Sequence, residues 1–466
     1  MSSPSTVVAH ESTASDLHDE RSTRYALLAA VVASFIVTFD AVVVNVALPR
    51  IRTDLGGGIN GLQWIVDGYT LMFAALLLTA GAVTDRAGAR RAFIIGVTAF
   101  TVASIACGLA PGLGTLIAAR IAQGSAAALM MPACMALISH AYPDPARRAH
   151  ALALWGVGGA IASSSGPLLG GVLTVASWRL IFLVNLPVGI AAVAFATKSR
   201  PSPTRDATID ATGTLSAIAA MGGLTYGAIE AGVHGITAPD VLAAFATAVV
   251  GTVVFVRSQQ ASERPMVPLE LFGRRNVVVS MAVGFAFVVG YYGLPFVMSL
   301  YLQQRRGLTP FQTGLVFLPM MLTGAALVSF AAIIARRFGS RRVIITGLAL
   351  MAAGLVALAA TTTTASPALI AALMALPGLA GPLIIPPITA ILLNSVPDPL
   401  AGAASGVFNT SRQLGGALAI AIFGALLAHP TGIDRGMSFS LLIAAAIAVA
   451  AALATTLLRP ATASRQ

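Results

Sequence analysis

Four charged residues lie inside long apolar segments of the chain: Asp40, Asp67, Arg120 and Arg412. A charged side chain at the centre of a bilayer costs about 3 kcal/mol or more, so such residues usually mark ion or substrate pathways. The helical rise of about 1.5 Å per residue puts Asp40, Asp67 and Arg120 at a similar depth, in the outer half of a membrane. Their side chains are therefore candidates for proton chemistry.

Two carboxyl groups at one depth disfavour each other's ionisation, whereas a nearby arginine favours it. We predict that Asp40 and Asp67 are proton sites, or sites for protons and a cationic substrate, with Arg120 as the counter-charge. The alternatives are that Asp40 is a packing residue bonded to neighbouring backbone and that Asp67 is a solvated helix-end residue. Arg412 is either a structural arginine or a substrate contact, because no acidic residue lies in the last four predicted spans.

The composition predicts an all-α polytopic membrane protein. Hydrophobic residues make up 57% of the 466 residues and charged residues only 10%, against about 25% charged residues in soluble domains. Runs of about 20 apolar residues can cross the hydrocarbon core, and about fourteen are present. They cover residues 26–48, 62–83, 92–110, 113–139, 150–173, 178–197, 211–229, 239–256, 277–303, 311–334, 342–361, 367–393, 402–428 and 437–458.

The charge distribution predicts the orientation. Most of the 28 Lys and Arg residues lie in connections on the side of the N-terminus, so both termini are predicted to be cytoplasmic. The basic residues come in small groups between apolar spans, which argues against nucleic-acid binding. Cys107 and Cys134 lie in apolar runs and predict neither a disulfide framework nor a metal site. The sequence contains no G-x-x-x-x-G-K-[ST] loop, so we expect no transport driven by the protein's own ATP hydrolysis and predict no cofactor.

An internal repeat divides the chain. The pattern Arg86, Gly88, Arg90, Arg91 recurs at 337–342, again in a turn between two spans. A parallel duplication with an insertion is predicted. The predicted parts are a disordered cytoplasmic tail (1–24), an N-terminal six-helix bundle (25–200), two inserted transmembrane helices with linkers (201–276), a C-terminal six-helix bundle (277–458) and a cytoplasmic tail (459–466).

Seven segments carry a resemblance to a known family. They are FDAVVVNVALP (39–49), WIVDGY (64–69), GAVTDRAGARR (81–91), RIAQGSAAALMMP (120–132), GGAIASSSGPLLGG (158–171), WRLIFLVNLPVG (178–189) and NTSRQLGGALAIA (409–421). Over residues 25–458 the chain resembles the major facilitator superfamily, in its fourteen-span drug:proton antiporter branch, and is similar to exporters of the methylenomycin A resistance type. The resemblance implies the major facilitator fold: two six-helix bundles around a cavity, plus two inserted helices.

The resemblance also implies two sets of gating residues. A motif that locks the cytoplasmic helix ends by ion pairs comprises Asp85, Arg86, Gly88, Arg90 and Arg91. In the second copy Arg336 replaces the aspartate, so that half is predicted to lack an equivalent lock. The antiporter motif comprises Gly158, Gly159, Gly166, Pro167, Gly170 and Gly171, whose small residues allow close helix packing and whose proline allows a bend.

A lipophilic substrate requires an adaptable apolar pocket, which thioethers and aromatic rings provide. The candidates for substrate binding are Asn45, Met130, Met131, Phe287, Tyr291, Tyr292, Phe296, Phe317, Met320, Met321 and Arg412. The alternative for each apolar residue is an ordinary core or lipid-facing position.

Together these features predict a monomeric proton-coupled antiporter in the bacterial inner membrane. It would export drugs or toxic lipophilic compounds by alternating access, with protons, membrane lipid and the small-molecule substrate as its partners. Export of an endogenous metabolite by the same fold is the alternative. A membrane enzyme would need a cluster of His or carboxylate residues near one membrane face, and a channel would need a filter-like repeat or ring of charges. The sequence contains neither.

Overall fold

The computed structural model describes residues 5–204, 206–263, 265–361, 365–428 and 432–459. All regular structure in these ranges is helical. The first half contains α1 (Ser5–Leu55), α2 (Ile59–Ala87), α3 (Ala89–Gly108), α4 (Leu113–Ala141), α5 (Pro145–Ala176), α6 (Leu180–Leu183), α7 (Asn185–Thr197), α8 (Ala211–His234) and α9 (Pro239–Ala261). The second half contains η1 (Leu269–Gly273), α10 (Arg275–Leu300), η2 (Tyr301–Arg305), α11 (Pro310–Val328), α12 (Ala331–Phe338), α13 (Ser340–Thr361), α14 (Pro367–Leu393), α15 (Asp398–Ala428) and α16 (Ile433–Thr455).

Thirteen helices in the described ranges are long and apolar enough to cross a membrane. The prediction of an all-α polytopic membrane protein is therefore confirmed. α6 and α7 together make one of these spans, Leu180–Thr197. The predicted span that falls outside the thirteen is α8, whose glycines, threonines and Glu230 lower its hydropathy although it is 24 residues long.

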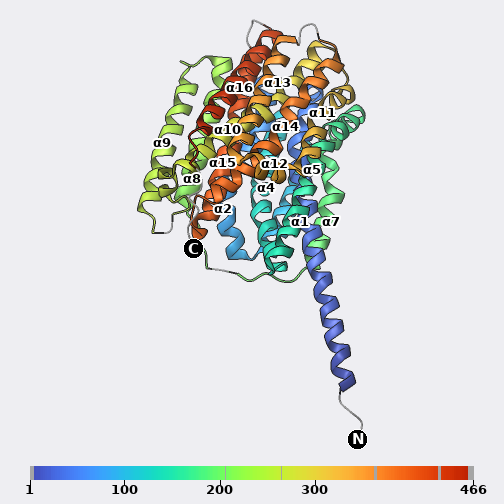
Figure 1. Cartoon of the computed structure of the whole chain (residues 1–466). Coiled ribbons are helices and arrows are strands. Elements are labelled where there is room, and N and C mark those ends of the chain that lie inside the picture. The colour runs from blue at the N-terminus through green and yellow to red at the C-terminus, as the bar shows by residue number, and fades with distance from the viewer. Residues whose placement is uncertain (1–4, 205, 264, 362–364, 429–431, 460–466) are drawn as a thin grey trace.

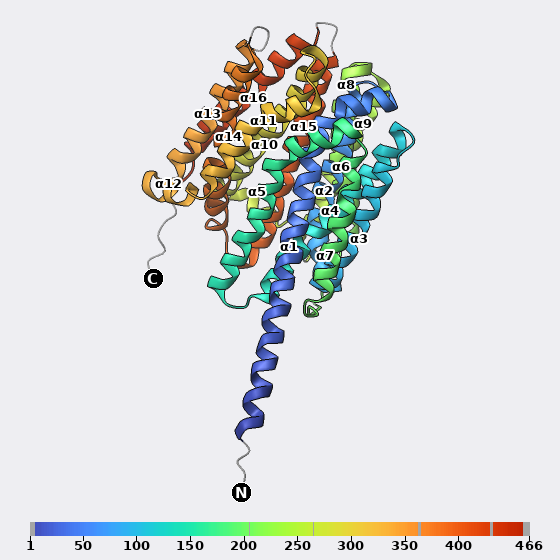
Figure 2. The same cartoon turned by 90° about the vertical axis from the view of Figure 1, so that its right-hand side faces the viewer.

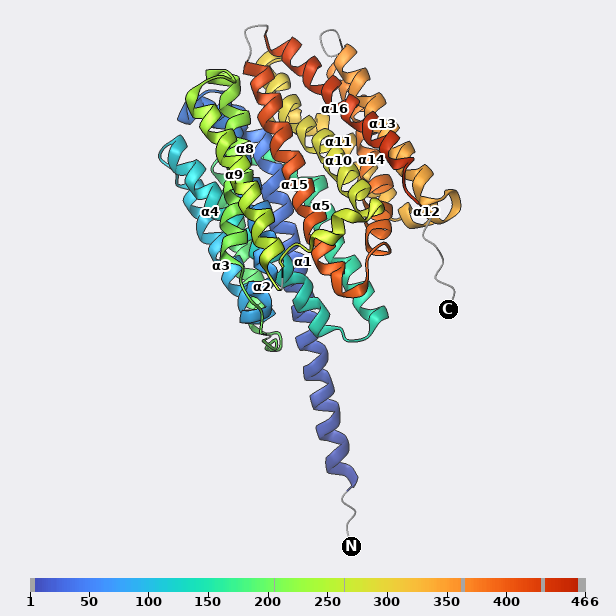
Figure 3. The same ribbon diagram turned by 90° about the vertical axis from the view of Figure 1, so that its left-hand side faces the viewer.

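The helices pack as two groups with a hairpin on one side. α1 packs on α5 and α7, and α4 packs on α2 and α3. In the second group α10 packs on α15 and α16, and α14 on α11 and α13. The groups meet where α2 packs on α15 and where α5 packs on α11. The hairpin α8–α9 lies outside both groups, with α8 against α2 and α15 (Figure 3).

The beginning of α1 and the end of α16 lie toward one end of the molecule (Figures 1 and 2). We call this the terminal end and the opposite one the far end. α1 begins at Ser5 and extends beyond the other helices at the terminal end, so its first turns differ from the predicted disordered tail. No proline interrupts the chain between Pro4 and Pro49, so nothing blocks propagation of the helix toward the N-terminus.

The second half departs from the predicted spans at one break. The predicted span 311–334 covers the end of α11 at Val328 and the start of α12 at Ala331.

The two copies of the turn motif have the same backbone conformation at their glycine. Gly88 and Gly339 have nearly the same positive φ, 82° and 83°. Glycine adopts this conformation without a Cβ penalty, which explains its place in both turns.

Close helix contacts depend on glycines that face backbone. Gly124 of α4 lies directly against Tyr69 of α2, so that a Cβ atom built there would be 2.8 Å from the Tyr69 Cα. Small residues let membrane helices approach until backbones touch, which maximises dispersion and holds the side chains of both helices in register. This contact therefore fixes the position of the middle of α2 relative to α4.

We expect Gly124→Val to lower the melting temperature of the detergent-purified protein, because α2 and α4 would have to separate. Overpacking of this kind costs about 1–3 kcal/mol. Gly156→Val is the matched control, since an added Cβ atom at Gly156 meets nothing within 4 Å. Equal melting temperatures for the two variants would contradict the close approach.

Candidate functional site

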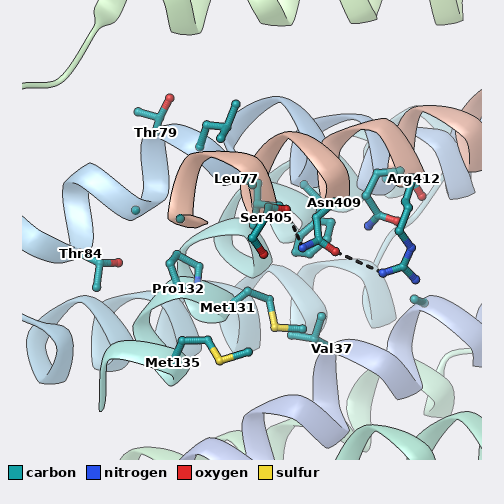
Figure 4. A pocket seen from close by; sticks show the side chains of 18 of the residues that line it. Val37, Leu77, Thr79, Thr84, Met131, Pro132, Met135, Ser405, Asn409 and Arg412 are labelled. Atoms are coloured by element: carbon teal, nitrogen blue, oxygen red, sulfur yellow. Dashed lines mark hydrogen bonds between the residues drawn. The ribbon is translucent and has the colours of Figure 1, made fainter. Parts of the chain in front are cut away.

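A cavity of about 990 Å³ lies between the two groups of helices. Its lining comes from α1, α2, α4, α5, α10, α11 and α15. Figure 4 shows one part of it, where Met131, Met135 and Val37 face Asn409 and Arg412. The lining continues to Asp85 and Asp206, which are exposed at the terminal end. The cavity is therefore open toward the end where α1 begins.

The far end is closed by contacts between the two groups. Ser299 donates to the Asn45 carbonyl oxygen at 2.6 Å, and Gln303 donates to the Val46 carbonyl oxygen at 2.9 Å. On the other side Gln63 donates to the carbonyl oxygens of Ile420 and Ala421, at 2.8 and 2.6 Å. These bonds join α1 to α10 and α2 to α15, and they close the cavity at the far end.

Asp40 and Arg120 form a buried ion pair, in which Arg120 Nη1 donates to Asp40 Oδ2. The side chains are 0% and 1% exposed, respectively. The other carboxylate oxygen, Oδ1, accepts from Gln123 Nε2 at 2.8 Å and from Asn185 Nδ2 at 3.2 Å. Removing one member of a buried pair leaves an uncompensated charge, which costs about 3–5 kcal/mol. Asp40 belongs to α1, Arg120 to α4 and Asn185 to α7, so the ion pair and its hydrogen bonds hold these three helices together.

Arg120 has further partners that fix its direction. Its Nε donates to the Ile65 carbonyl oxygen at 3.0 Å, and its Nη1 donates to Gln123 Oε1 at 2.8 Å. The guanidinium carbon lies 4.3 Å from the centre of the Tyr69 ring. Tyr69 lines the cavity, whereas Asp40 and Arg120 do not. The Tyr69 ring therefore lies between the ion pair and the cavity.

Asp67 is not part of this network and does not line the cavity. It is 0% exposed, and neither of its carboxyl oxygens has a hydrogen-bond partner among the residues that the structure describes. One turn before it, Trp64 Nε1 donates to Glu230 of α8 at 3.2 Å. One turn after it, Leu71 packs against Met221 of α8. Since Gln63 contacts α15, Asp67 lies at the junction of α2, α8 and α15 and is not a solvated helix-end residue.

Arg412 belongs to the cavity. Its Nη1 donates to Asn409 Oδ1 at 3.2 Å (Figure 4), and its guanidinium carbon lies 5.8 Å from the centre of the Phe408 ring. Its Nε is buried without a partner among the described residues. Within that part of the chain Arg412 forms no ion pair. The hydrogen bond that Nη1 donates is thus to the neutral Asn409 side chain, and both predicted roles of Arg412, structural arginine and substrate contact, stay predictions.

The predicted substrate residues divide into two sets. Those that line the cavity are Asn45, Met131, Tyr291, Tyr292, Met321 and Arg412. Those that are buried among the helices and do not line it are Met130, Phe287, Phe296, Phe317 and Met320. The division follows from helix geometry, because neighbours such as Met130 and Met131 point about 100° apart around the axis. Only one stripe of each helix faces the cavity.

Sequence reasoning missed several functional side chains. Gln123 and Asn185 complete the shell around Asp40, and Met135 and Asn409 line the cavity. Gln123 had a usable signal, since it lies three residues after Arg120 and so on the same helix face. Asn185 is a polar residue within an apolar span, which is a similar signal.

The charged residues Asp85, Arg86 and Arg91 of the predicted gating motif form no ion pairs within the described residues. Gly88 has a φ of 82°, and Arg90 contacts the connection after α7 through the Thr197 carbonyl oxygen and, from its backbone N–H, Ser202 Oγ. Asp85 lines the mouth of the cavity and forms no ion pair with a described residue. Arg86 and Arg91 likewise have no ion-pair partner within the described ranges. This arrangement fits a cavity that is open at the terminal end.

The glycines of α5 face other helices. Gly158 lies against Val31, Gly159 against Ser34, and Gly166 and Gly170 against Val42 and Val43, all of α1. Across the boundary between the two groups, Gly171 meets the backbone of Pro310 and Phe311 in α11, and Gly314 of α11 meets the Pro167 carbonyl. α5 therefore connects the helix that carries Asp40 to the opposite group.

A family model described as the Major Facilitator Superfamily matches residues 30–420. The chain belongs to the major facilitator superfamily. It is therefore a multi-pass membrane transporter and not an enzyme, and the predicted family and fold are confirmed.

Individual relatives agree with this assignment. The chain is 36% identical over 414 residues to the methylenomycin A resistance protein of Streptomyces coelicolor, covering 87% of this chain and 86% of that protein. It is 36% identical over 406 residues to multidrug resistance protein Stp of Mycobacterium tuberculosis, covering 86% of this chain and 75% of the relative. The fold is also that of solved transporters, including a D-xylose–proton symporter (TM-score 0.68, 14% identity, 96% of this chain and 100% of that one). A bacterial homologue of the lysosomal transporter Spinster, solved in an inward-facing conformation, has a TM-score of 0.67 at 16% identity, over 93% of this chain and 96% of the homologue.

We expect transport to require separation of the contacts at the far end. Arg52 Nη1 donates to Gln304 Oε1 at 3.3 Å across the two groups, so the pair Arg52→Cys and Gln304→Cys should be linked by a short bifunctional thiol reagent. Linked protein should lose transport, measured in proteoliposomes, because the far end cannot open. Each single variant treated with the same reagent is the control. Full transport by the linked protein would contradict this movement.

Proposed function

We propose that this protein is a proton-coupled antiporter that exports lipophilic compounds across the bacterial inner membrane by alternating access. The main support for the proposal is the cavity between the two groups of helices, which is open at the terminal end and closed at the far end. The buried Asp40–Arg120 pair lies next to this cavity, separated from it by the Tyr69 ring. The names of the relatives, which include multidrug resistance, methylenomycin A resistance and drug efflux proteins, support export of toxic compounds.

From the excess of Lys and Arg on the side of the termini, we infer that the terminal end lies in the cytoplasm. The cavity then faces the cytoplasm, where a compound enters it from water or from the inner leaflet. Its volume of about 990 Å³ is at the upper end of ordinary ligand sites. Met131, Met135 and Met321 supply flexible thioether surfaces that suit varied shapes. Opening of the far end and closure of the terminal end would then release the compound outside.

Asp40 supplies the proton-coupling step. When a proton binds its carboxylate, the ion pair is lost and Arg120 keeps only carbonyl and amide oxygens as partners. A buried guanidinium without a counter-charge is costly, so protonation favours a conformation that gives Arg120 water or another anion. The Tyr69 ring separates Arg120 from the cavity, so its displacement would connect the two sites.

The movement that follows protonation of Asp40 would be transmitted to the other half of the protein through α5. α1 carries Asp40 and lies against Gly166 and Gly170 of α5. The same helix touches α11 of the opposite half at Pro167 and Gly171. A shift of α1 on loss of the ion pair therefore acts on the boundary between the halves. Small side chains let these helices slide or bend without large steric barriers.

Asp67 is the second proton site in the proposal. A buried carboxylate with no donor is costly, so the neutral acid is the form that suits the junction of α2, α8 and α15. That junction contains helices of both halves and lies in the closed far-end region. Opening of the far end would expose Asp67 to outside water. The inserted hairpin α8–α9 then acts as one wall of this site.

Export of an endogenous metabolite remains the alternative reading of the same cavity, since its lining suits any lipophilic compound of this size. The division of the chain at 200 and 276, the monomeric state and the cytoplasmic position of both termini are further parts of the proposal. A susceptibility panel on an efflux-deficient host that expresses this chain tests the choice of substrate. A change in resistance to toxic compounds favours drug export, and no change for any compound favours the metabolite.

We expect Asp40→Asn to insert normally but to lose proton-driven export. The amide cannot carry the charge that pairs with Arg120, so proton binding no longer alters the network. Substrate-dependent proton movement in everted vesicles, read with a pH-sensitive dye, should fall to background. Glu263→Gln, an exposed carboxyl group outside the network, is the control. Wild-type coupling in the Asp40→Asn variant would contradict the proposed role of Asp40 in proton coupling.

We expect Asp67→Asn to retain thermal stability and to lose coupling. A neutral amide resembles the protonated acid in shape, so the unpartnered site should accept it, whereas the site can no longer release a proton. Melting in detergent and pH dependence of export measure the two effects separately. Export that keeps the wild-type dependence on the proton gradient would remove Asp67 from the mechanism.

A further inference from the structure

Among the described residues that line the cavity, Arg412 carries a strongly basic group that the proton chemistry does not use. Arg412 of α15 lines the cavity and lies beside Asn409, opposite Met131 (Figure 4). Arg120, the other arginine inside the predicted spans, is committed to Asp40, Gln123 and the Ile65 carbonyl. Arg412 has no comparable set of partners.

The contacts of Arg412 are electrically neutral. Asn409 Nδ2 donates to the Ser405 carbonyl oxygen at 3.0 Å, which directs Asn409 Oδ1 toward Arg412 Nη1 at 3.2 Å. The Nε of Arg412 is buried with no partner in the described part of the chain. An orienting amide holds the guanidinium in place without neutralising it. A fixed, unneutralised guanidinium is the arrangement that binds planar oxyanions.

The acidic residues of the cavity lie away from Arg412. Within the described lining, the carboxyl groups are those of Asp85, Asp206 and Asp210, all near the terminal end. Asp210 is already engaged, since it accepts from the backbone N–H of Gly213 and from Gln259 Nε2, both at 2.7 Å. Asp40 and Asp67 do not line the cavity. The region around Arg412 therefore carries a positive charge and no protein carboxylate to balance it.

The surroundings of Arg412 suit the rest of such a ligand. Tyr291 and Tyr292 line the same cavity from α10, with ring centres 6.0 Å apart. Met131 and Met321 line it from α4 and α11. Aromatic and thioether groups bind apolar ring systems with little demand on shape.

We propose that Arg412 binds the acidic group of the exported compound, so that the preferred substrates are lipophilic organic anions with a carboxylate attached to an apolar or aromatic body. This inference rests on the proposed export function and names its substrate class. The guanidinium pairs with the carboxylate, and the aromatic and methionine side chains contact the body. A cationic compound of the same shape would meet an unpaired positive charge in an apolar cavity, which disfavours its binding.

The experiment compares three compounds that share one fluorescent ring system: a carboxylate, its neutral primary amide, and the corresponding amine cation. Uptake into everted vesicles is measured for the wild type, Arg412→Gln, Arg412→Lys and the control Arg435→Gln, which makes the same change at an exposed position outside the cavity. We expect the wild type to prefer the carboxylate. Arg412→Gln should weaken apparent affinity for the carboxylate by about tenfold or more, with the amide unchanged and Arg412→Lys intermediate.

Binding to the purified protein is measured in parallel by the change in intrinsic tryptophan fluorescence, since Trp155 lines the cavity. Loss of transport for all three compounds, with carboxylate binding that still depends on Arg412, would overturn the export function and leave the anion site standing. A wild type that prefers the amine, or an Arg412→Gln variant that loses all three compounds equally while melting like the wild type, would overturn the anion site. If Arg412→Gln does not fold, Arg412→Lys provides the same comparison with the charge retained and the planar fork removed.

Discussion

The ion pair between Asp40 and Arg120 is the constraint on which the arrangement of the first half depends. Two opposite charges without solvent are tolerable only when they meet and when their remaining hydrogen-bonding atoms are satisfied. Gln123 and Asn185 donate hydrogen bonds to the second carboxylate oxygen of Asp40, and the Ile65 carbonyl oxygen accepts one from Arg120. The same bonds tie α1, α4, α7 and α2 together. A proton is the smallest ligand that breaks this condition, and it does so without any change in volume.

In the proposed mechanism, substrate binding and proton chemistry occupy different sides of the same helices. Tyr69 faces the cavity while its ring covers Arg120, and Asp67, two residues earlier on α2, faces the inserted hairpin and α15. The carboxyl groups proposed for proton exchange, Asp40 and Asp67, do not line the cavity, whereas Arg412 does, and it forms no ion pair with a described carboxylate. Under the proposed mechanism, this separation would let a proton change the conformation without competing for the atoms that hold the substrate.

The two halves are joined at the far end by bonds that can be remade in water. Ser299, Gln303 and Gln63 all donate to backbone carbonyl oxygens of the opposite half. A carbonyl oxygen exchanges such a donor for water at a small net cost, about 0.5–1.5 kcal/mol per bond. Four such bonds are strong enough together to hold this end closed and weak enough individually to be broken when the halves separate. α5 and α11 meet through glycines and Pro167, so the same boundary can move without steric obstruction.

The sequence by itself determined the membrane-spanning helices, the family, the turn repeated at Gly88 and Gly339, and the few charges that lie inside the spans. It could do so because lipid disfavours charge and favours apolar length at every position independently. It also indicated that Asp40 and Arg120 lie at one depth. Only the tertiary structure decided that those two pair while Asp67 stays apart, that Met131 and Met321 face the cavity while Met130 and Met320 do not, and that Asn185 joins the network. Depth follows from counting residues along one helix, whereas facing depends on the rotation of each helix against its neighbours, which packing across the whole bundle sets.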